Sequence, residues 1–252
     1  MSAALRLRFG LGLCLALLLP VAARAADEPE KPWKIDTAVA FNSDYMFRGQ
    51  NLYDGISIQP SAGVSYDTGF GTVGASIWMH TSAEGDRQEE KFFELDKTIS
   101  YAYDFDKLSF KTGFLWYFYP DSSDDINDTS EYYVGLSYDD SEVSPFALNP
   151  SLTYYKDYRE YDTSYFELTF SHAIETDALG KGFNTTPYVT FGFCGNSDKI
   201  YADDGLEFVA IGTSFNLTLG DIAVVPTINY SFKVDDNTVN EFWVGFTLGY
   251  TI

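Results

Sequence analysis

The sequence predicts an all-β protein, an antiparallel up-and-down transmembrane β-barrel of about 12 strands, with about 10 or 14 strands as alternatives. Apolar and polar residues alternate with a period of two over most of the chain beyond residue 34. Short turns and long acidic connections also follow one another in alternation. Beyond the N-terminal leader no apolar run is long enough for a membrane helix, so membrane insertion would require a closed barrel.

The first 25 residues have the pattern of a secretory signal peptide. Arg6 and Arg8 precede the apolar run LGLCLALLLPVAA, and an A-x-A site follows it. Cleavage near Ala25 or Ala26 would leave residues 26–34 as a short periplasmic segment and residues 35–252 as the barrel. An uncleaved membrane anchor is the alternative. The leader predicts export through the secretory pathway to the outer membrane of a Gram-negative bacterium.

In the first half, the alternation predicts six strands. Each has one apolar face, as in the first, where Ile35, Val39 and Phe41 lie opposite Asp36, Ala40 and Asn42. The expected strands are 35–47, 56–66, 72–80, 92–105, 108–119 and 131–139.

Six further strands follow in the second half, and the last alternates to the end of the chain. Phe242, Val244, Phe246, Leu248, Tyr250 and Ile252 share its apolar face. These strands are 146–156, 164–174, 185–194, 207–219, 222–233 and 241–252. Such a terminal strand can close the barrel against the first one, because an open edge would leave unpaired backbone groups in lipid. A soluble β-sandwich or small soluble barrel is the alternative.

Composition narrows the class further. Without the leader the chain keeps 13 of its 16 basic residues and has 37 acidic ones. This strongly negative net charge argues against a nucleic-acid partner. Cys194 would be the one cysteine left, so no intramolecular disulfide can form. Expected partners are outer-membrane lipid and lipopolysaccharide, the outer-membrane assembly machinery and small hydrophilic solutes; the pattern says nothing of oligomeric state.

Parity along the strands predicts a polar lumen face. Its charged candidates are Asp44, Arg48, Glu94, Asp96, Lys111, Glu131, Glu167, Lys233 and Glu241. Acidic groups outnumber basic ones there, so a water-filled pore would favour cations or neutral solutes. Arg48 could pair across the barrel seam, for instance with Glu241, or select solutes. The same parity turns Tyr45 and Phe47 toward lipid.

Several tyrosines share the lumen face by the same parity: Tyr117, Tyr119, Tyr133, Tyr155, Tyr165 and Tyr188. They could bind sugars or fill a narrow lumen. A barrel of about 12 strands lies between filled and open cases, so open and plugged lumens both remain possible.

The stretch SDYMFRG at Ser43–Gly49, with YFYP at 117–120 and SEYYVGLSY at 130–138, resembles a family of Gram-negative proteins named from sequence as outer-membrane porins. Their substrates are mostly unassigned. The resemblance implies a porin and brings no catalytic residues. It covers the first half of the chain well and the second half only in general pattern.

Enzyme and metal chemistry find little support. His80 and His172 are the two histidines, and no G-x-S-x-G, H-x-x-x-H or cysteine cluster accompanies them. We expect no enzyme activity, no cofactor and no metal site, with His80 at the rim and His172 facing lipid. The acidic connection with Asp121, Asp124, Asp125, Asp128 and Glu131 could hold a divalent cation, but a solvated loop is the simpler interpretation.

These observations together predict a porin-like channel for passive diffusion of small hydrophilic solutes. The alternative is a structural or surface-interaction barrel with a filled lumen and acidic, cation-binding external loops.

Overall fold

The computed structural model describes residues 32–83, 93–120, 128–142, 146–175, 183–196 and 199–252. The predicted leader and the acidic segment at 121–127 lie outside these residues. Within the described chain no helix is long and apolar enough to cross a membrane.

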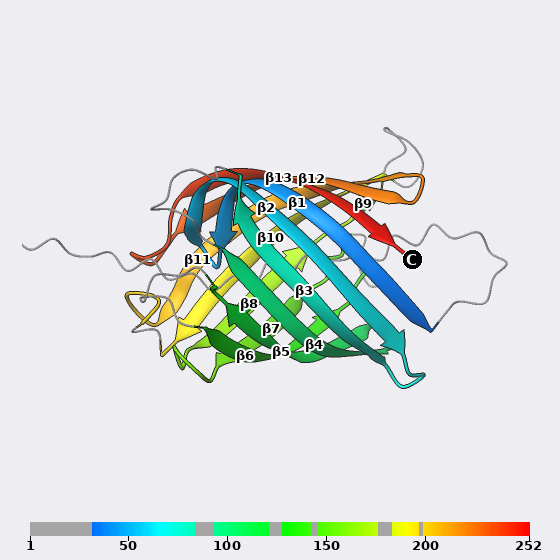
Figure 1. Cartoon of the computed structure of the whole chain (residues 1–252), viewed down its shortest axis with the longest axis horizontal. Helices are drawn as coiled ribbons and strands as arrows, with labels where there is room; N and C mark the ends of the chain where they lie inside the picture. Colours follow the sequence, from blue (N-terminus) through cyan, green and yellow to red (C-terminus); the bar gives the residue numbers. More distant parts are fainter. Residues whose placement is uncertain (1–31, 84–92, 121–127, 143–145, 176–182, 197–198) are drawn as a thin grey trace, which may run out of the picture.

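The regular elements of the described residues are β-strands, arranged in one closed antiparallel sheet (Figure 1). They are β1 (Trp33–Phe47), β2 (Gln50–Asp67), β3 (Thr72–Ser82), β4 (Glu94–Phe105), β5 (Leu108–Phe118), β6 (Thr129–Tyr138), β7 (Ser151–Asp157), β8 (Ser164–Ser171), β9 (Ile174–Glu175), β10 (Asn184–Gly195), β11 (Gly205–Leu219), β12 (Ile222–Lys233) and β13 (Glu241–Thr251).

We call each strand position around the barrel wall a stave. The ring has 12 staves, as the alternation predicted. β8 and β9 both pair with β10, so they form one stave interrupted at His172 and Ala173. β13 closes the ring on β1, from the Asp36–Thr251 pair to the Asn42–Gly245 pair. The regular terminal strand is therefore explained, because it supplies the closing ladder.

Connections divide the barrel into two ends. The turn end holds the start of β1, the end of β13 and tight turns such as the one between β4 and β5. The loop end holds the β1–β2 turn and the connections after β3, β5, β7, β10 and β12. In Figure 1 the marked C-terminus lies at the turn end, on the right.

The outer surface of the barrel is apolar. Large exposed side chains occupy it on many staves, among them Val64, Ile99, Phe114, Leu136 and Phe246. Charged and hydroxyl side chains are buried inside instead, including Glu94, Glu131 and Ser57. This is the inverse of a soluble barrel, whose apolar face points inward.

Two sequence boundaries were wrong in an informative way. β2 begins at Gln50 rather than at residue 56, so β1 and β2 meet in a two-residue turn. β7 begins at Ser151 rather than at residue 146, because Phe146–Pro150 forms part of the turn-end connection.

The β1–β2 hairpin leaves the barrel wall near its tip. Pairing of β1 with β13 ends at Asn42, and pairing of β2 with β3 is confined to Ser57–Asp67. Between these points, residues 43–56 keep strand pairing only with each other. We call this segment the inner hairpin; it lies at the loop end, at the left of Figure 1.

Register shifts explain why the parity prediction failed here. Shifts at Asn42–Asp44 and at Tyr45–Met46 change the facing of the side chains that follow. Tyr45 is 0% exposed and Phe47 5% exposed, so the prediction that they face lipid was wrong. Both rings fill the barrel interior.

Candidate functional site

The inner hairpin is anchored by an ion pair across the lumen. The Nη1 and Nη2 atoms of Arg48 donate to the two carboxylate oxygens of Glu131 on β6, at 2.8 and 2.9 Å. Tyr117 donates its hydroxyl to the same carboxylate at 2.9 Å. Both ion-pair side chains are at most 5% exposed. A bidentate pair of this kind fixes both distance and direction.

Aromatic rings complete the surroundings of Arg48. Its guanidinium carbon lies 4.1 Å from the ring centre of Tyr165, 4.6 Å from that of Tyr155 and 4.7 Å from that of Phe47. Such contacts stabilise a cation that has lost its water. Burial lowers the pKa of Arg48, but the Glu131 carboxylate outweighs that effect and raises the pKa well above its ordinary value. The guanidinium therefore stays charged.

These contacts show that the hairpin reaches the far wall. In a ring of 12 staves β7 lies opposite β1, and Arg48 touches residues of β6, β7 and β8. A single hairpin thus crosses the whole lumen at the loop end.

Two aromatic clusters fill the space on either side of Arg48. On one side Tyr45, Phe47 and Tyr53 of the hairpin pack with Leu115, Tyr117, Tyr119 and Tyr161. On the other side a second cluster comprises Tyr155, Tyr165, Cys194, Tyr201, Phe208 and Ala210. We call the inner hairpin together with these two clusters the plug.

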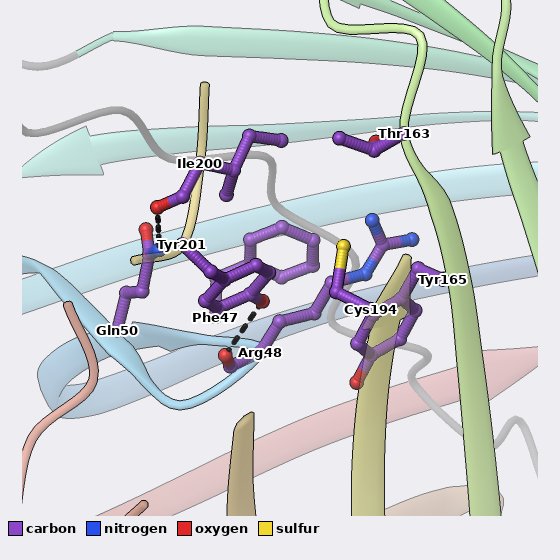
Figure 2. Close-up of a pocket in the computed structure, with 8 residues that line it drawn as sticks. All are labelled: Phe47, Arg48, Gln50, Thr163, Tyr165, Cys194, Ile200 and Tyr201. Carbon is purple, nitrogen blue, oxygen red and sulfur yellow. Dashed lines mark hydrogen bonds between the residues drawn. The ribbon is translucent and has the colours of Figure 1, made fainter. Parts of the chain in front are cut away.

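Loops after β10 and β12 cover the plug from the loop end. Tyr201 donates its hydroxyl to the backbone oxygen of Arg48 at 3.0 Å, and Gln50 donates to the backbone oxygen of Ile200 at 3.2 Å, as Figure 2 shows. The amide of Val239 donates to the backbone oxygen of Gly49 at 2.9 Å. The pocket beside Arg48 in Figure 2 has a volume of about 10 Å³, roughly the room for one water molecule.

Backbone geometry at the hairpin tip requires glycine. Arg48 and Gly49 both have positive φ, 44° and 80°, as in the turns that match strand twist. A Cβ atom on Gly49 would lie 2.6 Å from the Cβ of Phe208. The tip is therefore in direct contact with β11.

Carboxylates surround the plug. Tyr45 donates its hydroxyl to Glu94 at 2.8 Å, and Tyr119 donates to the other Glu94 oxygen at 3.2 Å. Asp96 is 3% exposed on the same strand. In the described chain Arg48 is the one buried lysine or arginine, against buried Asp44, Glu94, Asp96, Glu131, Asp157, Glu207 and Asp235.

The nine charged candidates therefore fall into two groups. Asp44, Arg48, Glu94, Asp96 and Glu131 are buried in or around the plug, while Glu167 is half-buried next to Tyr165, whose hydroxyl donates to it at 3.3 Å. Lys111 is exposed on the turn-end side of the lumen face, Lys233 pairs with Asp236 at 3.1 Å, and Glu241 is half-buried at the loop end. Their role in lining a conducting pore stays a prediction.

Arg48 pairs across strands, as predicted, but its partner is Glu131 on β6 and not Glu241, the example that the sequence suggested at the barrel seam. Sequence reasoning also missed Tyr45, Tyr201 and Phe208 as parts of the plug. An arginine–glycine turn is not a strong hairpin signal, and register shifts leave no period-two signature.

The predicted rim position was wrong for His80, whereas His172 lies at the turn end, where the sequence placed it. His80 is 0% exposed rather than at the rim; its Nδ1 lies 2.8 Å from the Ser57 hydroxyl, and its ring stacks on Tyr45 at 4.6 Å between ring centres. His172 lies at the turn end, where its Nδ1 is 2.6 Å from the backbone oxygen of Ala147. No cluster of three or more metal-ligating side chains occurs in the described ranges.

Comparison with solved structures places the fold. An outer-membrane channel from Pseudomonas putida F1 has a TM-score of 0.59 and 10% identity, with 91% of this chain and 99% of that chain covered. LpxR from Salmonella typhimurium has a TM-score of 0.56 and 8% identity, with 86% and 99% covered. At these identities the likeness concerns the fold alone, which resembles that of Gram-negative outer-membrane proteins.

No curated protein sequence matches the chain. A family model described as "Bacterial protein of unknown function (Gcw_chp)" matches residues 26–208, well over half of the sequence. The porin name that the sequence resemblance brought is not part of that description, and the stretch Ser43–Gly49 as a family signature stays a prediction. The protein belongs to this bacterial Gcw_chp family and has the closed 12-stave barrel of outer-membrane proteins.

Proposed function

We propose that the protein is a porin-like channel of the Gram-negative outer membrane, which lets small hydrophilic solutes diffuse passively through its lumen. The observation that carries this proposal is the turn half of the lumen. Small polar side chains line it on most staves, and none of them is buried: Ser61, Ser65, Ser76, Thr98, Ser100, Ser137, Ser151, Thr153, Thr186 and Ser214. Lys111 is also exposed there.

A lumen of this kind suits water and polar solutes. Hydroxyl side chains can replace part of a solute's hydration, while small volumes leave space between opposite walls. A barrel with a purely structural role could fill its interior at both ends, whereas the hydrophobic clusters among the described residues lie toward the loop end.

We expect cations or neutral solutes to be favoured. Arg48 and Glu131 neutralise each other in their ion pair, and the carboxylates Glu94, Asp96 and Glu167 remain inside the barrel. The apolar outer surface supports contact with lipid and lipopolysaccharide, and the regular β13 strand fits recognition by the assembly machinery.

The test is single-channel conductance of the refolded mature chain in a planar bilayer, with the reversal potential measured under a salt gradient. We expect ohmic steps with cation preference, because the lumen face is acidic. Anion preference would contradict the electrostatic part. Protein that is shown separately to be folded and inserted can be silent because the inner hairpin blocks the lumen. If a variant without the inner hairpin is also silent, the channel function is wrong.

The packed loop half favours one alternative, a structural or surface-interaction barrel with cation-binding external loops. The acidic connection at 121–127 that would supply most of the ligands lies outside the described residues, while Asp128 accepts from the backbone amide of Tyr119 at 3.1 Å. An enzyme role gains no support from His80, since it and Ser57 are both 0% exposed inside the barrel.

A further inference from the structure

We propose that the inner hairpin is a gate, and that the Arg48–Glu131 ion pair is the latch that holds it shut. This inference rests on the proposed channel function and specifies how that channel is regulated. The closed state is the one described here. The open state has residues 43–56 withdrawn from the lumen.

The inner hairpin is separate from the ladders that close the barrel wall. The barrel stays closed by the β1–β13 ladder below Asn42 and by the β2–β3 ladder from Ser57 onward. Movement of residues 43–56 leaves both ladders intact, because these residues pair in strands only with one another. It breaks two hydrogen bonds at the base of the hairpin, from the amide of Ala83 to the backbone oxygen of Ile56 and from the amide of Val244 to the hydroxyl of Ser43. A gate built this way can move while the staves stay fixed.

A second argument concerns how the hairpin is held. Its tip is fixed by a small number of directional contacts: the Arg48–Glu131 pair, the Tyr201 and Val239 hydrogen bonds and the Tyr45–Glu94 bond. These contacts are polar and can be exchanged for water when the hairpin moves. The rings of Tyr45, Phe47 and Tyr53 must leave their aromatic cluster in the same movement, so opening requires these packing contacts to be lost as well.

The third argument is electrostatic. Arg48 is the buried cation among several buried carboxylates on the surrounding strands, notably Glu94, Asp96 and Glu131. When the hairpin carries Arg48 away, these carboxylates remain on the lumen wall, facing water. Opening would thus both remove the hairpin from the lumen and expose these carboxylates on the lumen wall, which favours entry of cationic solutes.

Two other groups of side chains are less suited to a function of their own. The Ser57–His80 pair is sealed behind Tyr45 and Tyr53, whose rings lie 4.6 and 5.6 Å from the His80 ring centre, so it becomes accessible only if the gate opens. The outward aromatic group of Tyr132, Tyr154 and Phe166 belongs to the apolar barrel surface.

The experiment compares open probability in planar bilayers for three folded proteins. Glu131→Gln removes the carboxylate that holds Arg48 and should raise open probability at least tenfold over wild type. Asp162→Asn removes one carboxylate at the same end of the barrel, from a side chain that is 72% exposed and away from the latch, and should leave open probability within about twofold. Heat-modifiable migration on gels and circular dichroism check that each variant forms the barrel.

A cross-link supplies the opposite perturbation. In a Cys194→Ser background, Gln50→Cys with Ile200→Cys places thiols on the hairpin and on the covering loop, whose side chain and backbone already touch. A short bis-maleimide should abolish openings, and each single-cysteine chain treated in the same way should be unaffected. Unchanged openings in the cross-linked protein would overturn the gate while leaving the channel in place.

A third variant separates the two proposals. Replacement of residues 43–56 by a short glycine–asparagine turn removes the gate and should give permanently open channels. If this variant is folded and inserted but silent, the channel function itself is wrong and the gate with it. If wild type, Glu131→Gln and the shortened chain all conduct alike, only the gate is wrong.

Discussion

The two halves of the barrel interior are built on opposite principles. The loop half is dry and packed, with Tyr45, Tyr117 and Tyr165 at most 1% exposed around a buried ion pair. The turn half is lined by small hydroxyl side chains that are all at least partly exposed, and Lys111 is solvated there. One strand pattern supports both, since period two fixes only which face is inward and leaves the size of the inward side chains free.

The difference shows that a barrel of this size can hold a plug in one half of its interior without filling the other half. Large aromatic side chains and an entire hairpin occupy one half, while the same number of staves leaves space in the other. The wall therefore does not depend on a filled interior: the ladders hold it in the turn half, and the plug adds rigidity only at the loop end.

The largest effect is expected from Arg48→Met. This change leaves the Glu131 carboxylate buried without its cation, which typically costs about 3–5 kcal/mol of folding free energy. The double change Arg48→Met/Glu131→Leu should recover much of the loss, because no unpaired charge remains. Urea unfolding in lipid vesicles measures both. Additive losses in the double variant would show that the two side chains are not coupled.

An intermediate effect on stability is expected when a turn glycine at either end of the barrel is replaced by alanine. Gly49 and Gly69 have nearly the same φ, 80° and 78°, but a Cβ on Gly49 would meet Phe208, while nothing lies within 4 Å of the corresponding atom on Gly69. Gly69→Ala should cost about 1–2 kcal/mol from backbone strain alone. Gly49→Ala should cost clearly more and loosen the plug. Equal unfolding midpoints for the two variants would argue against close packing at the tip.

The smallest effects are expected from two carboxylates that cap connections. The Oδ1 atom of Asp157, 0% exposed at the loop end, accepts backbone amides of Arg159, Glu160, Tyr161 and Asp162 at 3.0–3.2 Å. Asp140, at the turn end, accepts those of Leu148 and Asn149 at 2.8–3.1 Å in partly open surroundings. Asp157→Asn should therefore lower the thermal midpoint more than Asp140→Asn. The reverse order would contradict the contrast between the two ends.

The carboxyl group of Asp140 should also make the stability of the fold depend on pH. Backbone amides of Leu148 and Asn149 lower the pKa of its carboxyl in the folded protein. Its contribution to stability is then present above the unfolded pKa and is lost as pH falls through the folded one. Asp140→Asn should remove this acid-side loss, so the two proteins should converge in stability at low pH, as measured by thermal unfolding between about pH 2 and 6.

Sequence reasoning went furthest where the chain is regular. Residues 72–80, 108–119 and 222–233 have clean alternation, and β3, β5 and β12 match them within two residues at each end. It failed at Tyr45 and Phe47, because a register shift reverses facing without changing the residue types. It also failed on the partner of Arg48, which lies 83 positions away in the chain.

The sequence by itself determined that the chain forms a barrel: its closure, a number of staves near 12, its apolar exterior and the acidic balance of its lumen face all follow from period-two alternation and composition. Only the tertiary structure decided that residues 43–56 leave the wall and cross the lumen to Glu131. The physical reason is that alternation is a local property of each strand. The facing of a hairpin beyond a bulge depends instead on ring and ion-pair contacts with residues far away in the chain, such as Glu131, Tyr155 and Tyr165, which no local pattern encodes.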